Sequence, residues 1–297
     1  MSFTRISISI PDATKSVGLK HGPWDIYALS TPGAAHLRKG RQSDDAFAMN
    51  MVGSYLVAVA SDGAGSARCG AEGSNLLAHG VTEFIAERLE NGTVGFMVDS
   101  TFENEWRALI EAAVANVRDK ILKDNNIEPT TSQIAQQETI LRDYHATLVG
   151  IVTTEDSGLF FHIGDGLCVT FDLPLNFTAA AEAVVPAACS LPQKGEHYGE
   201  TYFFSMQDWR SYLRLTFFKP ASIVLLMSDG VSSFVLHDDN LLYGPFIRPI
   251  AEYLTGADDH NLAAKKLLDT LTCAQANECS DDDKTLLWLS RTIPPVL

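Results

Sequence analysis

The sequence predicts an α+β domain in which helices cover largely antiparallel β-sheets. Apolar runs of strand length come in pairs joined by tight turns, and helical spacing is confined to a few separate stretches. Strands and helices do not alternate regularly, and short hairpin links require antiparallel pairing. We find no internal repeat, linker or break in composition, so residues 1–297 are expected to form one domain with its core at about 20–290.

Composition limits the classes of function. The chain carries a formal net charge of −15, which argues against nucleic acid or an anionic membrane as a main partner. Its five cysteines are odd in number and include no CxxC pair, which favours reduced thiols in a cytoplasmic protein. We recognise neither a signal peptide nor an apolar run of about 18 residues, so we expect no membrane span.

The first third of the chain is expected to be mostly strands. Residues 1–19 alternate weakly and predict either an edge strand or a loose N-terminal arm. The loop 31–44 is rich in Gly, basic and polar residues. Gly53-Ser54 separates two apolar runs, as in a β-hairpin. The strands expected here are 24–30, 46–52 and 55–60.

Helical spacing follows in the middle of the chain. Small residues after Gly63 open a helix that should end near Asn91-Gly92. From Trp106 to Ile121 apolar side chains recur every three or four residues, which predicts a helix packed on the core. A short polar helix is expected at 133–143.

Strands return in the second half, followed by helices and a last strand. The expected strands are 146–153, 159–163, 167–171, 202–205, 212–217, 223–227 and 285–289. The expected helical segments are 231–236, 244–254 and 262–273. Residues 172–200 form a long irregular segment, which in a compact domain is usually functional or mobile.

Two of these strands end alike. The apolar runs that begin at Tyr55 and Ser222 are both closed by Ser-Asp-Gly, which places Asp62 and Asp229 at the rim of a sheet. Two more acidic clusters precede strands and could join them: Asp44-Asp45 and Asp281-Asp282-Asp283. Converging carboxylates repel one another, and Mg2+ or Mn2+, which take oxygen ligands, would resolve that repulsion.

Five motifs, taken together and in order, resemble those of the metal-dependent protein phosphatases of type 2C, the PPM family. They are Asp44-Asp45-Ala-Phe, Val59-Ala-Ser-Asp62-Gly63, His162-Ile-Gly-Asp165-Gly166, Leu226-Met-Ser-Asp229-Gly230 and Asp282-Asp283-Lys-Thr285. Asp-Gly alone is common in turns, but the ordered set is a strong signal. His36 ahead of the acidic pair is similar to the bacterial branch of the family.

The resemblance implies an αββα sandwich of two antiparallel sheets flanked by helices, with a dinuclear Mg2+ or Mn2+ site at one edge. It implies a serine/threonine phosphoprotein phosphatase in which a metal-bridging water attacks the phosphomonoester. A phosphorylated protein would be the substrate, with a partner kinase in the same system. The irregular segments 172–200 and 231–244 would hold a flap that selects substrates.

The resemblance also assigns roles to residues. Asp62 would bridge the two metals, Asp229 and Asp282 would hold the first, the Gly63 carbonyl and Asp44 would serve the second, and Asp45 would hold or orient the attacking water. Asp165 is evenly balanced between a third metal ligand and a hairpin turn. The alternatives without metal binding are that Asp62 and Asp229 are turn residues and that Asp282 belongs to a solvated run of charges. His36, His145 and His162 are expected to be structural or loop histidines rather than ligands.

Two positions depart from the eukaryotic members of the family. Ala64 stands where many have a His that could act as general acid, and Gly40 stands where an Arg binds the substrate phosphate. Arg41 is then the first candidate for binding phosphate, with Arg38 and His36 as alternatives. These departures keep open a pseudophosphatase acting as a binding or regulatory module. A phosphohydrolase for a small molecule is the third hypothesis.

Overall fold

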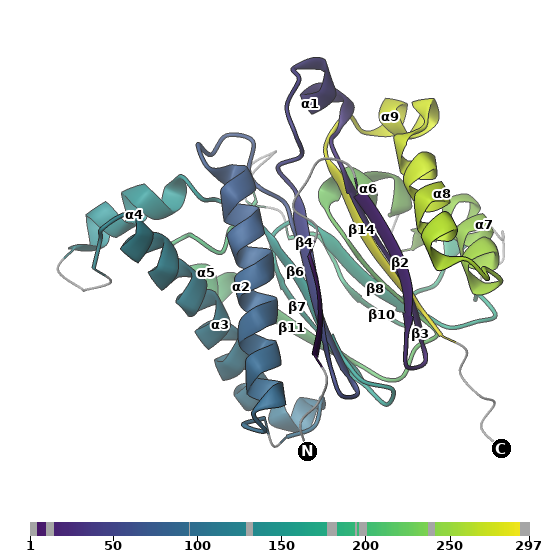
Figure 1. The fold of residues 1–297 in the computed structure, drawn as a ribbon, viewed down its shortest axis with the longest axis horizontal. Coiled ribbons are helices and arrows are strands. Elements are labelled where there is room, and N and C mark those ends of the chain that lie inside the picture. Colours follow the sequence, from purple (N-terminus) through teal and green to yellow (C-terminus); the bar gives the residue numbers. More distant parts are fainter. Residues whose placement is uncertain are drawn as a thin grey trace.

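Two six-stranded sheets pack face to face, and helices cover the outer face of each (Figure 1). The computed structural model describes residues 5–9, 15–94, 96–128, 133–176, 183–193, 195, 201–236 and 241–291. Within these ranges, every strand pairing is antiparallel. The expected αββα sandwich is confirmed.

The strands fall into two sheets and one small ribbon. The first sheet runs in the order β1 (Arg5–Ser9), β4 (Ala46–Val52), β5 (Tyr55–Ser61), β6 (Leu148–Thr153), β7 (Gly158–Ile163) and β11 (Arg214–Phe218). The second runs β10 (Ala188–Ser190), β8 (Leu167–Phe171), β12 (Ile223–Met227), β14 (Lys284–Ser290), β3 (Trp24–Thr31) and β2 (Lys15–His21). The ribbon pairs β9 (Ala183–Val184) with β13 (Leu242–Tyr243).

The helices divide between the two faces and the edge. The first sheet is covered by α2 (Gly70–Glu90) and α3 (Glu103–Asp124), with η1 (Ser100–Phe102), α4 (Ile134–Arg142) and α5 (Trp209–Tyr212) nearby. The second is covered by α7 (Gly244–Thr255) and α8 (His260–Thr272). The short helices are α1 (Ala34–Arg38), α6 (Asp229–Val235) and α9 (Ala274–Cys279). None of the helices in the described ranges is long and apolar enough to cross a membrane.

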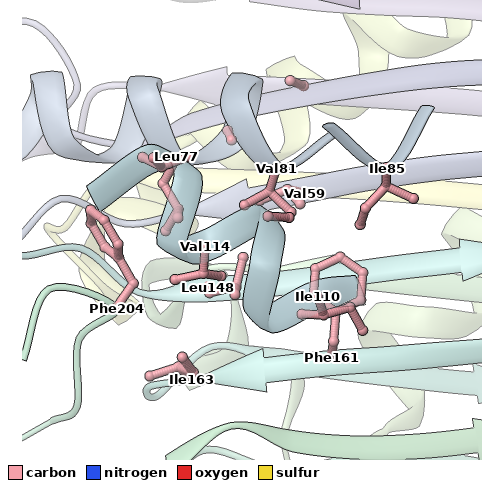
Figure 2. Close-up of a cluster of buried hydrophobic side chains, with 14 of the residues drawn as sticks. Val59, Leu77, Val81, Ile85, Ile110, Val114, Leu148, Phe161, Ile163 and Phe204 are labelled. Carbon is pink, nitrogen blue, oxygen red and sulfur yellow. The ribbon is translucent and has the colours of Figure 1, made fainter. Parts of the chain in front are cut away.

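Apolar side chains fill all three layers between these elements. Figure 2 shows the layer under α2 and α3, where Leu77 and Val81 of α2 and Val114 of α3 pack toward the first sheet. Between the two sheets, Met49 of β4 and Leu226 of β12 belong to a single buried cluster. Burying both faces of each sheet explains why the strands are apolar throughout rather than alternating.

Several elements differ from the sequence expectation. Of the two alternatives for residues 1–19, the edge strand is confirmed, because residues 5–9 and 15–21 are edge strands, one in each sheet. The loop 31–44 contains the five-residue helix α1. The strand expected at Tyr202–Ser205 is wrong, because the segment turns there and Phe204 is buried in the core without a strand partner. Much of the flap expectation, at 177–182, 194, 196–200 and 237–240, lies outside the described residues.

Candidate metal centre

The two Ser-Asp-Gly strand ends come together with a turn that connects the two sheets. Asp62 directly follows β5, Asp229 opens α6 after β12, and Asp165 lies in the turn between β7 and β8. One carboxylate oxygen from each lies within 4.8 Å of the other two. The cluster therefore draws side chains from both sheets at one edge of the sandwich.

Close backbone packing explains why glycine follows both aspartates. A Cβ atom on Gly63 would lie 2.6 Å from the carbonyl oxygen of Asp44 and 2.4 Å from that of Gly70. A Cβ atom on Gly230 would lie 1.9 Å from the carbonyl oxygen of Asp283. Any larger residue would push these segments apart, so the two glycines bring the acidic segments within reach of one another.

Hydrogen bonds to β6 and its neighbours fix the backbone at Asp62. The Asp62 N–H donates to Thr147 Oγ1 at 3.0 Å, and the Thr147 N–H donates to the Asp62 carbonyl at 2.8 Å. The Gly63 N–H donates to the Asp44 carbonyl at 3.1 Å, which ties the two acidic segments together. The Asp62 side chain is thereby aimed from a rigid strand end.

Burial and mutual repulsion raise the pKa of the clustered carboxyls. Burial, followed by the charges of Asp45 and Asp229, raises the pKa of Asp62 well above its usual value. Burial, followed by the charges of Asp165 and Asp282, raises the pKa of Asp229 to about 7. Asp45 is also raised, by burial first and then by Asp283. Six aspartates thus contribute to this mutual repulsion at the edge.

The donor set fits a hard divalent cation. Within the described residues, Asp45 Oδ2 and Asp229 Oδ1 are buried and receive no hydrogen bond. The hydroxyls of Ser228 and Thr285 bond to Asp45, but they supply no positive charge. Buried anionic oxygens without a counter-charge are costly, and Mg2+ or Mn2+ would compensate them with the oxygen ligation these ions prefer.

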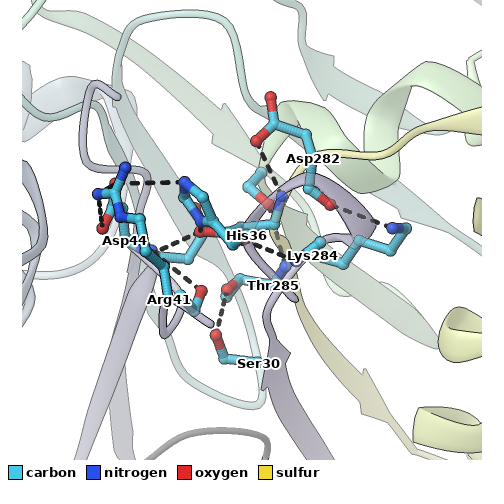
Figure 3. Close-up of polar contacts among 12 residues, drawn as sticks. Ser30, His36, Arg41, Asp44, Asp282, Lys284 and Thr285 are labelled. Atoms are coloured by element: carbon cyan, nitrogen blue, oxygen red, sulfur yellow. Dashed lines mark hydrogen bonds and ion pairs between the residues drawn. The ribbon is translucent and has the colours of Figure 1, made fainter. Parts of the chain in front are cut away.

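Beside this cluster, Asp283 joins two distant parts of the chain; its partners His36 and Asp44 and its neighbour Asp282 are labelled in Figure 3. Its carboxylate accepts the Gly33 N–H at 2.7 Å and the Asp44 N–H at 2.5 Å. His36 Nδ1 lies 2.9 Å from each of its oxygens. We call this arrangement of Gly33, His36, Asp44 and Asp283 the clasp; it fastens the loop before β4 to the start of β14.

Asp44 lies at the margin of the cluster and is paired. Arg41 donates to both of its carboxylate oxygens, at 2.8 and 3.1 Å, and His36 Nε2 lies 3.7 Å from Oδ2. Arg38, the alternative phosphate ligand, pairs with Asp281 at 2.7 Å on the surface. Both arginines predicted to bind phosphate therefore already have carboxylate partners, and their role stays a prediction.

The acidic triplet before β14 has three different environments. Asp281 and Asp282 are exposed, whereas Asp283 is 3% exposed. Asp282 Oδ1 accepts the Asp283 N–H at 2.9 Å, and its charge reaches both Asp62 and Asp229. The buried Lys284 Nζ donates to the Ser280 carbonyl at 2.9 Å and the Asp282 carbonyl at 3.1 Å, so a cation also lies close behind the triplet.

The remaining histidines have structural environments. His145 Nδ1 lies 2.6 Å from Ser205 Oγ, and its ring stacks on Phe203. His162 is fully buried with Nδ1 2.9 Å from Ser190 Oγ. Burial lowers the pKa of His145 to about 4 and that of His162 to about 3, so both rings are neutral at pH 7.

Sequence reasoning missed three kinds of residue around the cluster. Asp283 acts through backbone donors that lie 239 and 250 positions away, which no local pattern reveals. Thr147 anchors Asp62, and its place beside Ala146 in an expected strand was the available signal. Ser228 directly precedes Asp229, and Thr285 follows two residues after Asp283; both hydroxyls bond to Asp45.

Comparison with known proteins identifies relatives of this arrangement. Residues 32–272, more than half of the chain, match the family model described as "Protein phosphatase 2C". The serine/threonine-protein phosphatase 3 of Escherichia coli (strain K12) is 26% identical over 282 residues, covering 89% of this chain and 98% of that protein.

Solved structures show the same fold at lower identity. The serine/threonine phosphatase Stp1 from Staphylococcus aureus has a TM-score of 0.56 at 14% identity, over 96% of this chain and 100% of that one. The catalytic domain of the serine/threonine phosphatase PstP, solved in complex with two manganese ions, has a TM-score of 0.54 at 13% identity, over 91% of this chain and 99% of that one.

Proposed function

The chain belongs to the protein phosphatase 2C family, and from that premise we propose which of its residues carry out the reaction. It is a metal-dependent serine/threonine protein phosphatase. The observation that carries the proposal is the convergence of Asp62, Asp165 and Asp229 within 4.8 Å, with Asp45 and Asp282 in electrostatic reach. Carboxylates buried this close together repel one another, which would destabilise the fold if they were only turn or surface residues and bound no cation.

We assign two Mg2+ or Mn2+ ions to this edge. Asp62 would contribute to both ions, Asp229 and Asp282 would hold the first, and the Gly63 carbonyl with Asp44 would serve the second, so that together the two ions would acidify water and neutralise phosphoryl charge. Asp165 is the candidate for a third ion, which its place in the cluster favours over a simple turn role. Because Asp44 is paired with Arg41, its contribution to the second ion requires that this pair loosen when the ion binds.

The chain's own residues position the reactants. When bound, the cations acidify water and neutralise charge on the phosphoryl oxygens. Asp45, rigidly placed by Ser228 and Thr285, orients the attacking water. Arg41 binds the substrate phosphate once it leaves Asp44; its side chain is 47% exposed and can turn outward. With Ala64 in place of a His, the leaving-group oxygen takes its proton from water.

The substrate we propose is a phosphoserine or phosphothreonine in a protein. The relative in Escherichia coli is named as a serine/threonine-protein phosphatase, and it aligns over nearly its whole length. A partner kinase would phosphorylate the same protein. The net charge of −15 favours a basic or neutral region around the phosphorylated residue.

The test is hydrolysis of p-nitrophenyl phosphate and of a phosphothreonine peptide, with and without Mn2+. We expect turnover that needs Mn2+ and falls at least a hundredfold in Asp229→Asn, since this removes a charged ligand. Calorimetric titration with Mn2+ should show a site lost in Asp62→Asn. Mn2+ binding without turnover of either substrate would support a pseudophosphatase instead. Turnover of the small ester alone would indicate a small-molecule phosphohydrolase.

A further inference from the structure

A groove at the side of the sandwich contains two arginines that the proposed reaction does not use. It has a volume of about 440 Å³ and lies where β10, an edge of the second sheet, meets β11, an edge of the first. Its polar lining comes from Arg107 of α3, Ser190, Arg214 and Thr216. Two guanidinium groups in one groove are notable in a chain whose net charge is −15.

Arg214 lacks a counter-charge. One of its terminal nitrogens donates to the Leu191 carbonyl at 2.6 Å and lies 2.9 Å from His162 Nδ1. In the part of the chain that the structure describes, no carboxylate forms an ion pair with it, and Nε is buried without a partner. Burial lowers the pKa of Arg214, which reflects the cost of placing the cation there uncompensated.

The carboxylates near Arg107 lie at the outer limit of ion-pair distance. Arg107 donates to the Leu213 carbonyl at 3.1 Å, while Glu103 and Glu111 lie 3.9 and 4.0 Å away. Glu111 is engaged more closely by Arg210, at 3.2 Å. Arg107 and Arg210 therefore share two glutamates and Arg214 pairs with neither, so the groove keeps a net positive charge.

We propose that this groove binds a tetrahedral oxyanion, either free phosphate or a phosphoryl group. Arginine matches phosphate oxygens in geometry and charge, and the hydroxyl of Thr216 can donate to the same oxygens. A purely structural role, in which Arg214 ties β11 to the segment after β10, accounts for its bond to Leu191. That role leaves unexplained both the missing counter-charge and the second arginine.

The groove is linked to the acidic edge by a short path. Arg214 contacts His162 in β7, and Asp165 follows three residues later. The Gln193 N–H, just beyond β10, donates to the Gly164 carbonyl at 2.8 Å. The anion could therefore be phosphate released by the enzyme or a second phosphoryl group on its substrate. This site is separate from the carboxylates of the proposed reaction.

The test is calorimetric titration of the full chain with inorganic phosphate in EDTA at constant ionic strength, so that no cation recruits phosphate to the acidic edge. We expect binding that weakens at least tenfold in Arg214→Met and in Arg107→Met. Arg88→Met, which removes a half-buried arginine at the end of α2, should bind as the wild type does. If Arg214→Met does not fold, Arg107→Met on the outside of α3 decides.

Absence of phosphate binding in the wild type, or equal binding by both groove variants, overturns the proposal. Because the measurement is made without metal, it stands even if the enzyme shows no turnover. Peptides with one and two phosphoryl groups then separate the sources in the Mn2+-loaded enzyme. A lower KM for the doubly phosphorylated peptide that is lost in Arg107→Met, with kcat unchanged, identifies a substrate group. Equal KM values alongside phosphate binding identify free phosphate.

Discussion

Two groups of carboxylates lie side by side at the same edge of the sandwich, and the protein treats them in opposite ways. In the clasp, the Asp283 carboxylate accepts hydrogen bonds from two backbone N–H groups and lies against His36 Nδ1, and the Asp44 carboxylate accepts hydrogen bonds from Arg41. In the metal cluster, Asp62 and Asp229 face other carboxylates, and their pKa values are raised. Asp283, which is satisfied by donors of the chain, is a structural carboxylate, whereas Asp62 and Asp229, which face other carboxylates, await a cation.

The largest effect on stability should come from the clasp. Three donors converge on the two carboxylate oxygens of Asp283. In Asp283→Asn an amide NH2 replaces one of these oxygens, so at least one donor loses its acceptor. We expect the free energy of unfolding to fall by about 1–3 kcal/mol in EDTA, as for a buried donor left unsatisfied. Urea denaturation followed by circular dichroism measures it.

Asp281→Asn is the matched control, because it changes the same functional group two residues away. Asp281 is 58% exposed and pairs only with Arg38 on the surface. Its loss should change stability by no more than about 0.5 kcal/mol. Equal effects of the two substitutions would remove the distinction between the clasp and its solvated neighbour.

In the metal cluster, an Asp→Asn substitution should raise the stability of the metal-free protein rather than lower it. Asp62→Asn removes one charge from a group of repelling carboxylates, so in EDTA we expect the variant to be more stable than the wild type by about 1 kcal/mol. With saturating Mn2+ the order should reverse, because only the wild type gains the full binding free energy. Thermal melts in both buffers test this. Destabilisation in EDTA would show that Asp62 is structural, as Asp283 is.

A related effect should appear in the pH dependence of the metal-free protein. The pKa of Asp229 is about 7 in the folded chain and 3.8 as its ordinary value. Between these values the folded state holds more protons than the unfolded state, so this group's contribution to stability falls as pH rises from about 4 to about 7. The measurement is the stability of wild type relative to Asp229→Asn in EDTA across that range.

Taking the difference between these two proteins cancels groups that titrate in the opposite direction. His145 and His162 have pKa values lowered to about 4 and about 3, so their contributions rise with pH between those values and about 6.5. The relative stability of wild type should therefore decrease with pH even if the absolute stability does not. A flat or rising difference would contradict the repulsion among the clustered aspartates.

Much of this edge could be predicted because its signals are local. Asp62 and Asp229 each follow a strand whose apolar run is evident in the sequence, and strand ends are where side chains of different segments meet. The ordered motifs then gave the αββα fold and placed Asp165 and Asp282 in the same region. The hairpin at Gly53-Ser54 and the helix after Trp106 were predicted by the same short-range rules.

What escaped prediction depends on contacts between distant segments. Three consecutive aspartates look alike in the sequence, but only Asp283 is turned inward by the register of β14. The segment at Tyr202–Ser205 is apolar because Tyr202 stacks on Tyr212 and Phe204 fills the core, not because it pairs with another strand. Arg41 could be named as a cation near the site, but not its pairing with Asp44.

The position of the cluster across both sheets has a consequence for how the enzyme can vary. Asp62 follows a strand of one sheet and Asp229 follows a strand of the other, so the distance between them depends on how the two sheets are aligned. Side chains such as Met49 and Leu226, which fill the layer between the sheets, set that alignment from within. The packing of the apolar interior therefore sets the spacing of the carboxylates at the acidic edge. Substitutions of interior residues that contact no ion can change that spacing.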